Sequence, residues 1–184
     1  GGQQGLAGNA VGPSQVAALT RRRMSAQPAV GRQVGSVAPD FTLPDQFGQD
    51  VTLSTFLGRK AVALVFYPYA FSGVCTSEMA GIRGRLDDFL TFDTEVLAIS
   101  CDPMFSLRAF AEAESLNFGL LSDFWPHGEV ARSYGVLNEA RGAPRRSSYV
   151  VDLDGVIRWS VHNEPGQGRD LSEHLTQLRV ALGS

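Results

Sequence analysis

The spacing of hydrophobic and polar residues changes several times along the chain, and each change predicts an element of secondary structure. Residues 61–67 (Ala-Val-Ala-Leu-Val-Phe-Tyr) form an unbroken apolar run, as expected of a central strand covered on both faces. After Pro68 the spacing becomes helical. The apolar stripe of this helix consists of Met79, Ile82, Leu86, Phe89 and Leu90. The pattern therefore predicts a buried strand followed directly by one amphipathic helix over residues 72–92.

The rest of the chain continues this alternation of strands and helices. Further strands are predicted at residues 95–100 and 118–121, and further helices at residues 129–134 and 169–182. Between the two strands a helix is predicted whose apolar stripe includes Leu107, Phe110 and Leu116. Hairpins are predicted where residues 40–43 and 51–53 flank Asp-Gln-Phe-Gly, and where residues 147–151 and 156–160 flank Asp-Leu-Asp-Gly. This order predicts an α/β, thioredoxin-like fold, with a central mixed sheet flanked by helices and an N-terminal β-hairpin. A doubly wound nucleotide-binding sheet is disfavoured, because the sequence contains no G-x-G-x-x-G and no P-loop.

Residues 1–35 differ in composition from the domain that follows. They are rich in Gly, Ala and Gln and show no sustained periodicity. We therefore predict a flexible N-terminal extension over residues 1–35 and one domain over residues 36–184. The run Arg21-Arg22-Arg23 could contact a partner, but a solvated tail is favoured. Met24 could be the natural first residue, with tag or upstream residues before it.

Composition and charge narrow the class of protein further. Apolar residues make up 43% and charged residues 19% of the 184 residues, as in an ordinary globular domain. The net charge of −3 gives no electrostatic reason to expect nucleic acid or an anionic membrane as a partner. No apolar run approaches the roughly 18–20 residues of a membrane span, and no signal peptide is visible, so a cytoplasmic protein is expected. In that reducing compartment two cysteines are expected to be chemical rather than structural.

Cys75 is the candidate nucleophile, because it falls in the first turns of the helix that follows the buried strand. Free backbone N–H groups and the helix dipole favour an anion there, and a thiol reacts as its thiolate, from an ordinary pKa near 8.5. Ser72 lies one turn earlier, and its hydroxyl could cap the helix or hydrogen-bond the thiolate and a substrate oxygen. Glu78 lies one turn later and is expected to hold a cation in place. Pro68 fixes the turn that enters the helix.

The same positions argue against a dithiol oxidoreductase. A C-x-x-C motif would need cysteine at position 72 or 78, and those positions hold serine and glutamate. A single activated thiol suits attack on a peroxide O–O bond, which yields a sulfenic acid. From its position alone, a second interpretation is equally well supported, in which Cys75 is a small buried apolar residue with no chemical role.

The motif around Cys75 resembles a known family signature. Pro68-x-x-x-Ser72-x-x-Cys75 is similar to the peroxiredoxin pattern P-x-x-x-[TS]-x-x-C in its serine form. Residues 37–41 (Val-Ala-Pro-Asp-Phe), 75–78 (Cys-Thr-Ser-Glu) and 120–123 (Leu-Leu-Ser-Asp) agree in order and spacing, as does Arg146 before its strand. Residues 121–128 and 134–136 resemble the alkyl hydroperoxide reductase E type, a one-cysteine peroxiredoxin of actinobacteria. The resemblance covers about residues 34–182.

The resemblance implies a role for each matching residue. Cys75 would be the peroxidatic cysteine, Ser72 would hydrogen-bond the peroxide, and Pro68 would shield the site from water. Arg146 would stabilise the thiolate and the transition state, with Glu78 orienting arginine in the same network. Arg141 and Arg145 lie close by, so composition alone does not select Arg146. Its place immediately before the predicted strand at residues 147–152 favours it, and Arg145 is the alternative.

The resemblance also implies partners, but it leaves the recycling step open. The expected partners are a peroxide substrate, a low-molecular-weight thiol or a glutaredoxin-like or thioredoxin-like reductant, and a second copy in a homodimer. No cofactor or metal is expected, since the histidines lack metal-ligand spacing. Cys101 follows the predicted strand at residues 95–100. It could resolve the sulfenic acid if this strand is a parallel neighbour of the strand that leads to Cys75, but a free thiol is favoured. Phe124 and Trp125 are expected to pack or to contact the second copy.

Two other functions compete with the peroxidase. One is a redox sensor or relay that passes the oxidation of Cys75 to a partner protein. The other is a non-enzymatic binding or holdase module on the same scaffold. Fold alone does not decide among them, because thioredoxin-like domains carry many activities.

Overall fold

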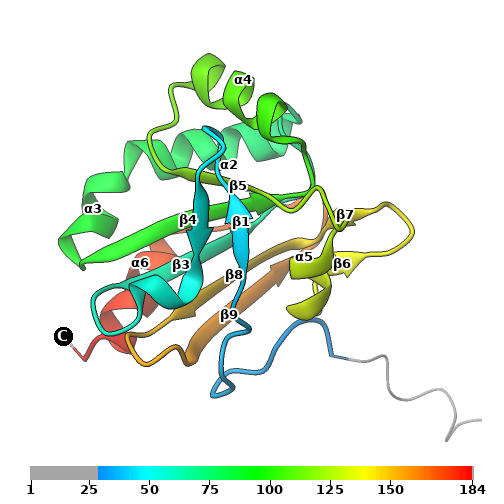
Figure 1. Ribbon diagram of the computed structural model, residues 1–184. Helices are drawn as coiled ribbons and strands as arrows, with labels where there is room; N and C mark the ends of the chain where they lie inside the picture. Colours follow the sequence, from blue (N-terminus) through cyan, green and yellow to red (C-terminus); the bar gives the residue numbers. More distant parts are fainter. Residues whose placement is uncertain (1–28, 184) are drawn as a thin grey trace, which may run out of the picture.

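A five-stranded mixed sheet runs through the middle of the molecule in the order β5-β4-β3-β8-β9 (Figure 1). The computed structural model describes residues 29–183. The strands of this sheet are β3 (Ala61–Phe66), β4 (Thr94–Ser100), β5 (Gly119–Ser122), β8 (Arg146–Val151) and β9 (Ile157–Asn163). β3, β4 and β5 are parallel, whereas β8 is antiparallel to β3 and to β9. The thioredoxin-like architecture predicted from the sequence is confirmed.

β3 lies at the centre of the sheet because its six residues are all apolar and all buried. Successive side chains of a strand point to opposite faces. Ala63 and Val65 therefore belong to one buried cluster, and Leu64 and Phe66 to another.

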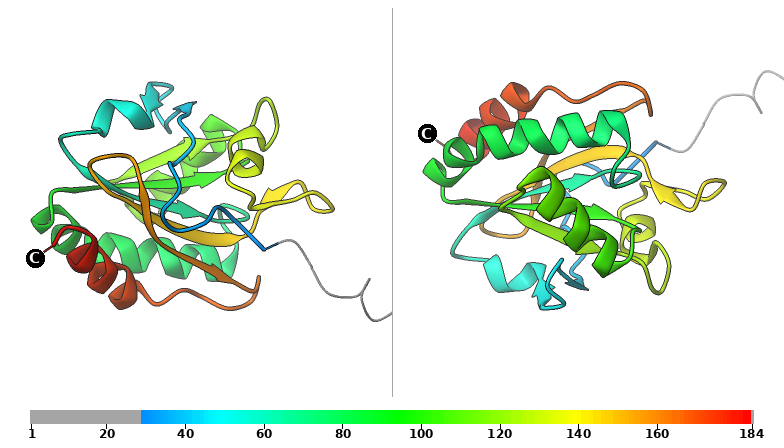
Figure 2. Two further views of the ribbon diagram at one scale, coloured as in Figure 1. Left: turned by 90° about the horizontal axis from the view of Figure 1, so that it is seen from below. Right: turned by 90° about the horizontal axis from the view of Figure 1, so that it is seen from above.

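Each face of the sheet is covered by its own set of elements (Figure 2). Four helices supply the first face: α2 (Gly73–Gly84), α3 (Leu86–Thr91), α4 (Met104–Glu114) and α6 (Leu171–Ala181). The second face is covered by smaller elements: β1 (Thr42–Pro44), β2 (Asp50–Thr52), the 3₁₀ helix η1 (Leu53–Phe56) and α5 (Glu129–Ser133). β1 and β2 form the predicted N-terminal hairpin, with Leu43 opposite Val51.

Two local features differ from the sequence prediction. The single helix predicted over residues 72–92 is wrong, because α2 ends at Gly84 and α3 begins at Leu86. Arg85 between them leaves helical geometry, with φ −120° and ψ 13°, and glycine is a poor helix former. A short hairpin of β6 (Leu137–Asn138) and β7 (Ala143–Pro144) was not predicted.

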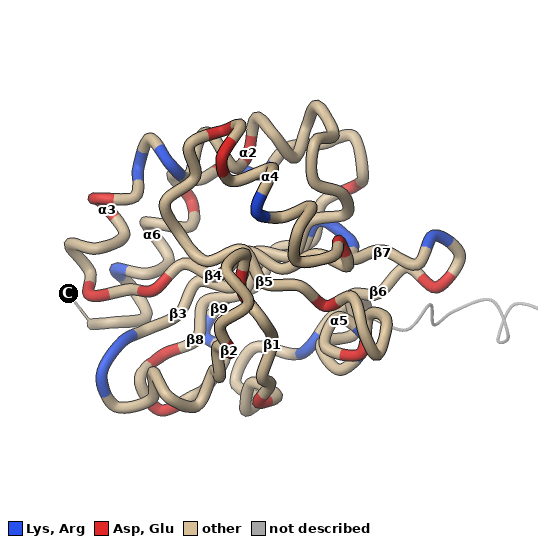
Figure 3. The backbone as a smooth tube through the Cα atoms, turned by 45° about the horizontal axis from the view of Figure 1, so that its top comes forward, with Lys and Arg blue, Asp and Glu red and all other residues tan. Residues whose placement is uncertain are grey.

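The N-terminal end of the described chain lies against the sheet and the segment after α5. The Gly31 N–H donates to the Gly135 carbonyl (3.1 Å) and the Gly35 N–H to the Ile157 carbonyl (2.7 Å). The last residues of the predicted extension thus contact the domain, whereas residues 1–28 lie outside the described residues. Charged residues of both signs are spread over the elements (Figure 3). Within residues 29–183, no helix is long and apolar enough to cross a membrane.

Candidate active site

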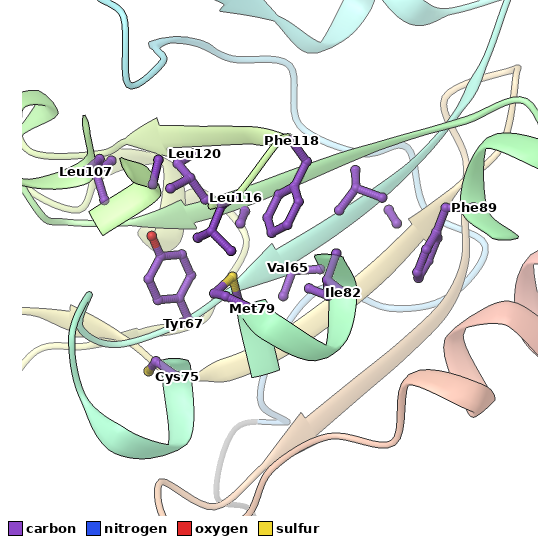
Figure 4. Close-up of a cluster of buried hydrophobic side chains, with 14 of the residues drawn as sticks. Val65, Tyr67, Cys75, Met79, Ile82, Phe89, Leu107, Leu116, Phe118 and Leu120 are labelled. Carbon is purple, nitrogen blue, oxygen red and sulfur yellow. The ribbon is translucent and has the colours of Figure 1, made fainter. Parts of the chain in front are cut away.

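Cys75 lies in the first turn of α2, two residues after the helix begins (Figure 4). Its side chain belongs to the buried cluster on the first face of the sheet, together with Tyr67 and Met79, and has no exposed surface. The backbone N–H groups of a first helical turn lack carbonyl partners within the helix. The thiol therefore sits where an anion or an incoming oxygen would meet free donors.

Ser72 is the residue that precedes α2, and its backbone is extended, with φ −70° and ψ 148°. Its carbonyl accepts the Thr76 N–H at 2.8 Å. Its hydroxyl donates to the Tyr69 carbonyl at 3.0 Å and does not cap the helix. Of the two uses predicted for this hydroxyl, side-chain capping is therefore not observed.

A pocket of about 230 Å³ opens beside this helix start. Pro68, Ser72 and Arg146 line it together, although Arg146 is far from the other two in the sequence. The remaining wall includes Arg141 and Arg145 from the β6–β7 segment and its continuation into β8. The fold thus brings three of the predicted site residues to one cavity, with Cys75 one helical turn beyond Ser72.

Glu78 forms the centre of a buried charge network beneath this pocket. Arg146 Nη1 donates to Glu78 Oε2 at 2.7 Å, and Arg146 Nε donates to the Pro165 carbonyl at 2.6 Å. Arg169 binds the same carboxylate on two edges: its Nε reaches Oε1 and its Nη2 reaches Oε2, both at 2.9 Å. The Arg169 backbone N–H also donates to Oε1 at 2.9 Å. The side chains of all three residues are at most 4% exposed.

The two arginines decide the ionisation of Glu78. Burial alone would raise the pKa of this carboxyl, but the hydrogen bonds and charge of Arg169, and then the charge of Arg146, lower it below its ordinary value. A charged Glu78 offsets only one of the two guanidinium groups. The network therefore carries an excess positive charge beside the helix that holds Cys75.

Comparison with known proteins agrees with this geometry. Residues 34–160 match the sequence profile of the AhpC/TSA family. The chain belongs to that family. It is 47% identical over 137 residues to alkyl hydroperoxide reductase E of Mycobacterium tuberculosis, a match that covers 74% of this chain and 90% of the relative.

Solved structures of the AhpC/TSA kind share the fold. The crystal structure of peroxidoxin BcpB from Mycobacterium tuberculosis superposes with a TM-score of 0.73 and 31% identity, over 80% of this chain and 97% of that one. Enterococcus faecalis AhpC superposes with a TM-score of 0.74 and 28% identity, over 80% and 90% of the two chains. As a member of this family of peroxiredoxins, the chain is a thiol-dependent peroxidase, an oxidoreductase.

Arg169 belongs to the buried network around Glu78, and it was not predicted from the sequence. Besides holding Glu78, its Nη1 donates to the carbonyls of Phe66 (2.7 Å) and Ser147 (2.9 Å) and to the Ser148 hydroxyl (3.1 Å). It thereby joins β3, β8 and α2. No local pattern marks it, because it is one arginine among several and its carboxylate partner lies 91 residues away.

Cys101 lies elsewhere in the family fold. It follows β4, which is a parallel neighbour of β3 as expected. Burial, and then the charges of Asp123 and Asp102, raise the pKa of its thiol to about 12, with Arg132 of α5 acting in the opposite direction. α5 packs on the second face of the sheet, whereas Cys75 belongs to the cluster on the first face.

The histidines take part in hydrogen bonds. His162 Nδ1 lies 2.8 Å from the Ser147 hydroxyl, and His174 Nδ1 lies 2.9 Å from the Asp170 carbonyl. Between residues 29 and 183, no group of three or more histidine, cysteine, aspartate or glutamate side chains is placed to hold a metal ion.

Proposed function

We propose that Cys75 attacks the peroxide, and that the substrates are hydrogen peroxide, organic hydroperoxides and peroxynitrite. The Cys75 sulfur bonds to the distal oxygen of the peroxide as the O–O bond breaks, and it is oxidised to the sulfenic acid Cys75–SOH. For a hydroperoxide the leaving oxygen takes one proton and departs as water or an alcohol. Sulfur gives up two electrons and the peroxide accepts both as its O–O bond breaks, so the step needs no cofactor.

The excess charge of the Glu78–Arg146–Arg169 network is the observation that carries this proposal. Negative charge develops on the leaving oxygen as the O–O bond breaks, and fixed donors aimed there lower the barrier. The Nε and Nη1 atoms of Arg146 are held by Pro165 and Glu78, whereas Nη2 has no hydrogen bond to any residue of the described chain. Because Arg146 lines the pocket, this N–H group is suited to bind a peroxide oxygen. Arg145 lines the same pocket but is exposed and makes no contact with Glu78.

Pro68 and Ser72 complete the proposed site from the other side of the pocket. The Pro68 ring would exclude water, and it presents no backbone N–H to compete for the substrate. The Ser72 hydroxyl would exchange its bond to the Tyr69 carbonyl for one to the peroxide. Glu78 and Arg169 would act through Arg146, as positioning residues rather than by touching the substrate.

Recycling of the sulfenic acid is proposed to use an external thiol. The candidates are a low-molecular-weight thiol and a glutaredoxin-like or thioredoxin-like protein. The raised pKa of Cys101, which follows from its burial and then from the charges of Asp123 and Asp102, supports a free thiol rather than a resolving cysteine, because a thiol attacks a sulfenic acid as its thiolate.

A homodimer is proposed from the family, and two exposed aromatic residues support it. Phe124 is 48% and Trp125 is 81% exposed in the single chain. Large exposed aromatic side chains are enriched at protein–protein interfaces. A second copy that covers them is the expected arrangement.

The decisive experiment is stopped-flow oxidation of the reduced protein by hydrogen peroxide, an organic hydroperoxide and peroxynitrite, followed by mass spectrometry. Wild type should consume peroxide rapidly and carry the added oxygen on Cys75, and Cys75→Ser should do neither. Full peroxide consumption by Cys75→Ser would refute the proposal. A disulfide between Cys75 and Cys101 after one equivalent of peroxide would instead assign Cys101 as the resolving cysteine. If turnover fails with small thiols but proceeds with a protein partner, the relay function is the correct one.

A further inference from the structure

Asp102, the residue after Cys101, holds the loop that carries the active site. Its Oδ2 accepts the backbone N–H of Ala70 at 2.9 Å and the Ser100 hydroxyl at 2.7 Å. Its carbonyl accepts the Ser122 hydroxyl at 2.6 Å. The backbone of Asp102 is thus tied to the end of β5, and its carboxylate is held by the end of β4 and reaches across to the segment between Pro68 and Ser72.

The loop that Asp102 binds has a conformation that needs outside contacts. Phe71, next to Ala70, has φ +66°, in the left-handed region that residues with a side chain rarely adopt. Its side chain is 55% exposed, although its ring lies 5.0 Å from that of Phe110 in α4. The Ala70–Asp102 hydrogen bond and the ring contact connect the loop to the rest of the domain, together with a longer hydrogen bond from the Tyr69 hydroxyl to the Arg141 carbonyl (3.4 Å).

Such a loop matters because Cys75 has no exposed surface. Hydrogen peroxide is close to water in size, and small movements at the neighbouring pocket would admit it. The sulfur of a larger thiol must approach the Cys75 sulfur in line, which requires the first turn of α2 to open. The folded loop therefore allows peroxide to oxidise Cys75, whereas a larger thiol can reduce the Cys75 sulfenic acid only when the loop is open.

Resting on the proposed role of Cys75, we propose that Asp102 is a positioning residue that sets the balance between these two forms of the loop. The reduction it controls is Cys75–SOH + RSH → Cys75–S–S–R + H₂O, in which the thiol supplies both electrons and its proton leaves in the water. A second thiol then releases Cys75–SH and the disulfide of the reductant. Because the folded form predominates, weakening it raises the opened fraction strongly while the folded fraction hardly changes.

The test compares the two half-reactions in Asp102→Ala and Asp102→Asn. Oxidation is followed by stopped flow with hydrogen peroxide. Reduction is followed by mixing the sulfenic acid form with thionitrobenzoate, a coloured thiol whose absorbance falls as the mixed disulfide forms. In Asp102→Ala we expect reduction to be about tenfold faster, the factor that the loss of one hydrogen bond to a carboxylate predicts, with oxidation within about twofold of wild type. Asn keeps an acceptor oxygen, so Asp102→Asn should remain near wild type in both.

Asp152→Ala is the matched control. Asp152 is a buried aspartate that accepts hydrogen bonds from Asp154, Val156 and Arg158, but it lies in the β8–β9 turn, at the opposite end of β8 from Arg146. Its removal should lower stability without changing either rate. If Asp102→Ala does not fold, Ser100→Ala takes its place, since it removes the hydrogen bond that orients the carboxylate, with roughly a two- to fivefold effect expected.

Hydrogen exchange supplies a readout that does not depend on peroxidase activity. Amides of residues 69–76 should exchange faster in Asp102→Ala, but not in Asp102→Asn or Asp152→Ala. Unchanged reduction and unchanged exchange in Asp102→Ala would overturn the role of Asp102 and leave the peroxidase proposal intact. An equal loss in both half-reactions would also overturn it, because Asp102 would then serve only the integrity of the site. Failure of wild type to form a sulfenic acid at Cys75, with exchange still responding to Asp102, would refute the peroxidase proposal instead.

Discussion

Replacing Glu78 by Gln tests the buried charge network most directly, because the two side chains have nearly the same shape. The carboxylate accepts four hydrogen bonds, two at each oxygen, all from Arg146 and Arg169. A glutamine amide has one acceptor oxygen, so its NH₂ group would face two N–H donors. Glu78→Gln therefore loses two hydrogen bonds and leaves two buried guanidinium groups without a counter-ion.

The expected cost is large on the scale of protein stability. Removing one partner of a buried ion pair costs about 3–5 kcal/mol, out of about 5–15 kcal/mol for a typical domain. Peroxide oxidation of Cys75 should also slow by about 10²-fold, the usual effect of losing one properly aimed donor, because Arg146 is no longer held. Urea unfolding and stopped-flow oxidation measure the two effects.

The difference in unfolding free energy between wild type and Glu78→Gln should also depend on pH. Glu78 has a pKa below its ordinary value of 4.5, so its charge stabilises the folded state fully above pH 4.5. That contribution is lost as the pH falls through the lowered folded-state pKa. The difference in unfolding free energy between wild type and Glu78→Gln should thus be greatest near neutral pH and should shrink in acid.

Glu95→Gln is the matched control for this substitution. Glu95 forms a salt bridge with Lys60 at 3.1 Å, but the side chains are 31% and 37% exposed. Solvent screens such a pair, so the expected loss is under about 1 kcal/mol with no change in peroxide oxidation. Equal losses of stability in Glu78→Gln and Glu95→Gln would refute the view that the buried network holds a charged carboxylate.

Two further predictions concern residues outside the reacting site. Burial lowers the pKa of His174 below 6.5, although the hydrogen bond to the Asp170 carbonyl acts in the opposite direction. Protonation of His174 therefore costs more in the folded than in the unfolded state, and wild type should lose stability as the pH falls below about 6.5. His174→Phe keeps the ring contact with Trp159 and should lose less between neutral pH and about pH 5, which urea midpoints at the two pH values would show. The raised pKa of Cys101 predicts that iodoacetamide modifies it in Cys75→Ser only after unfolding, and rapid alkylation of the native variant would contradict this.

The parts of the fold that could be predicted are those whose signal is local. β3 is a run of six apolar residues, and the turns of the two predicted hairpins have distinctive sequences, so both were found. The break at Arg85 was missed because the apolar stripe continues at helical spacing across it, and Phe89 still joins the same buried cluster. The β6–β7 hairpin has two-residue strands, too short to show alternation.

The same distinction applies to the candidate site. Pro68, Ser72, Cys75 and Glu78 lie within one strand–helix junction, and their spacing alone sets them near one another. Arg146 was preferred to Arg145 because it precedes a strand, and the structure makes it the first residue of β8 and the partner of Glu78.

Arg169 and Asp102 had no such signal, since each acts on a segment that is distant in the sequence. Arg169 reaches Glu78 across 91 residues, and Asp102 reaches Ala70 across 32. Burying an arginine without a carboxylate partner is strongly unfavourable, and so is burying a carboxylate before its arginine partners are in place. The network can therefore form only when α2, the start of β8 and the segment before α6 have already come together. The position of Arg146 at the pocket then depends on the packing of the whole sheet, and this dependence explains why a local motif predicts a nucleophile but not the residues that hold its surroundings in place.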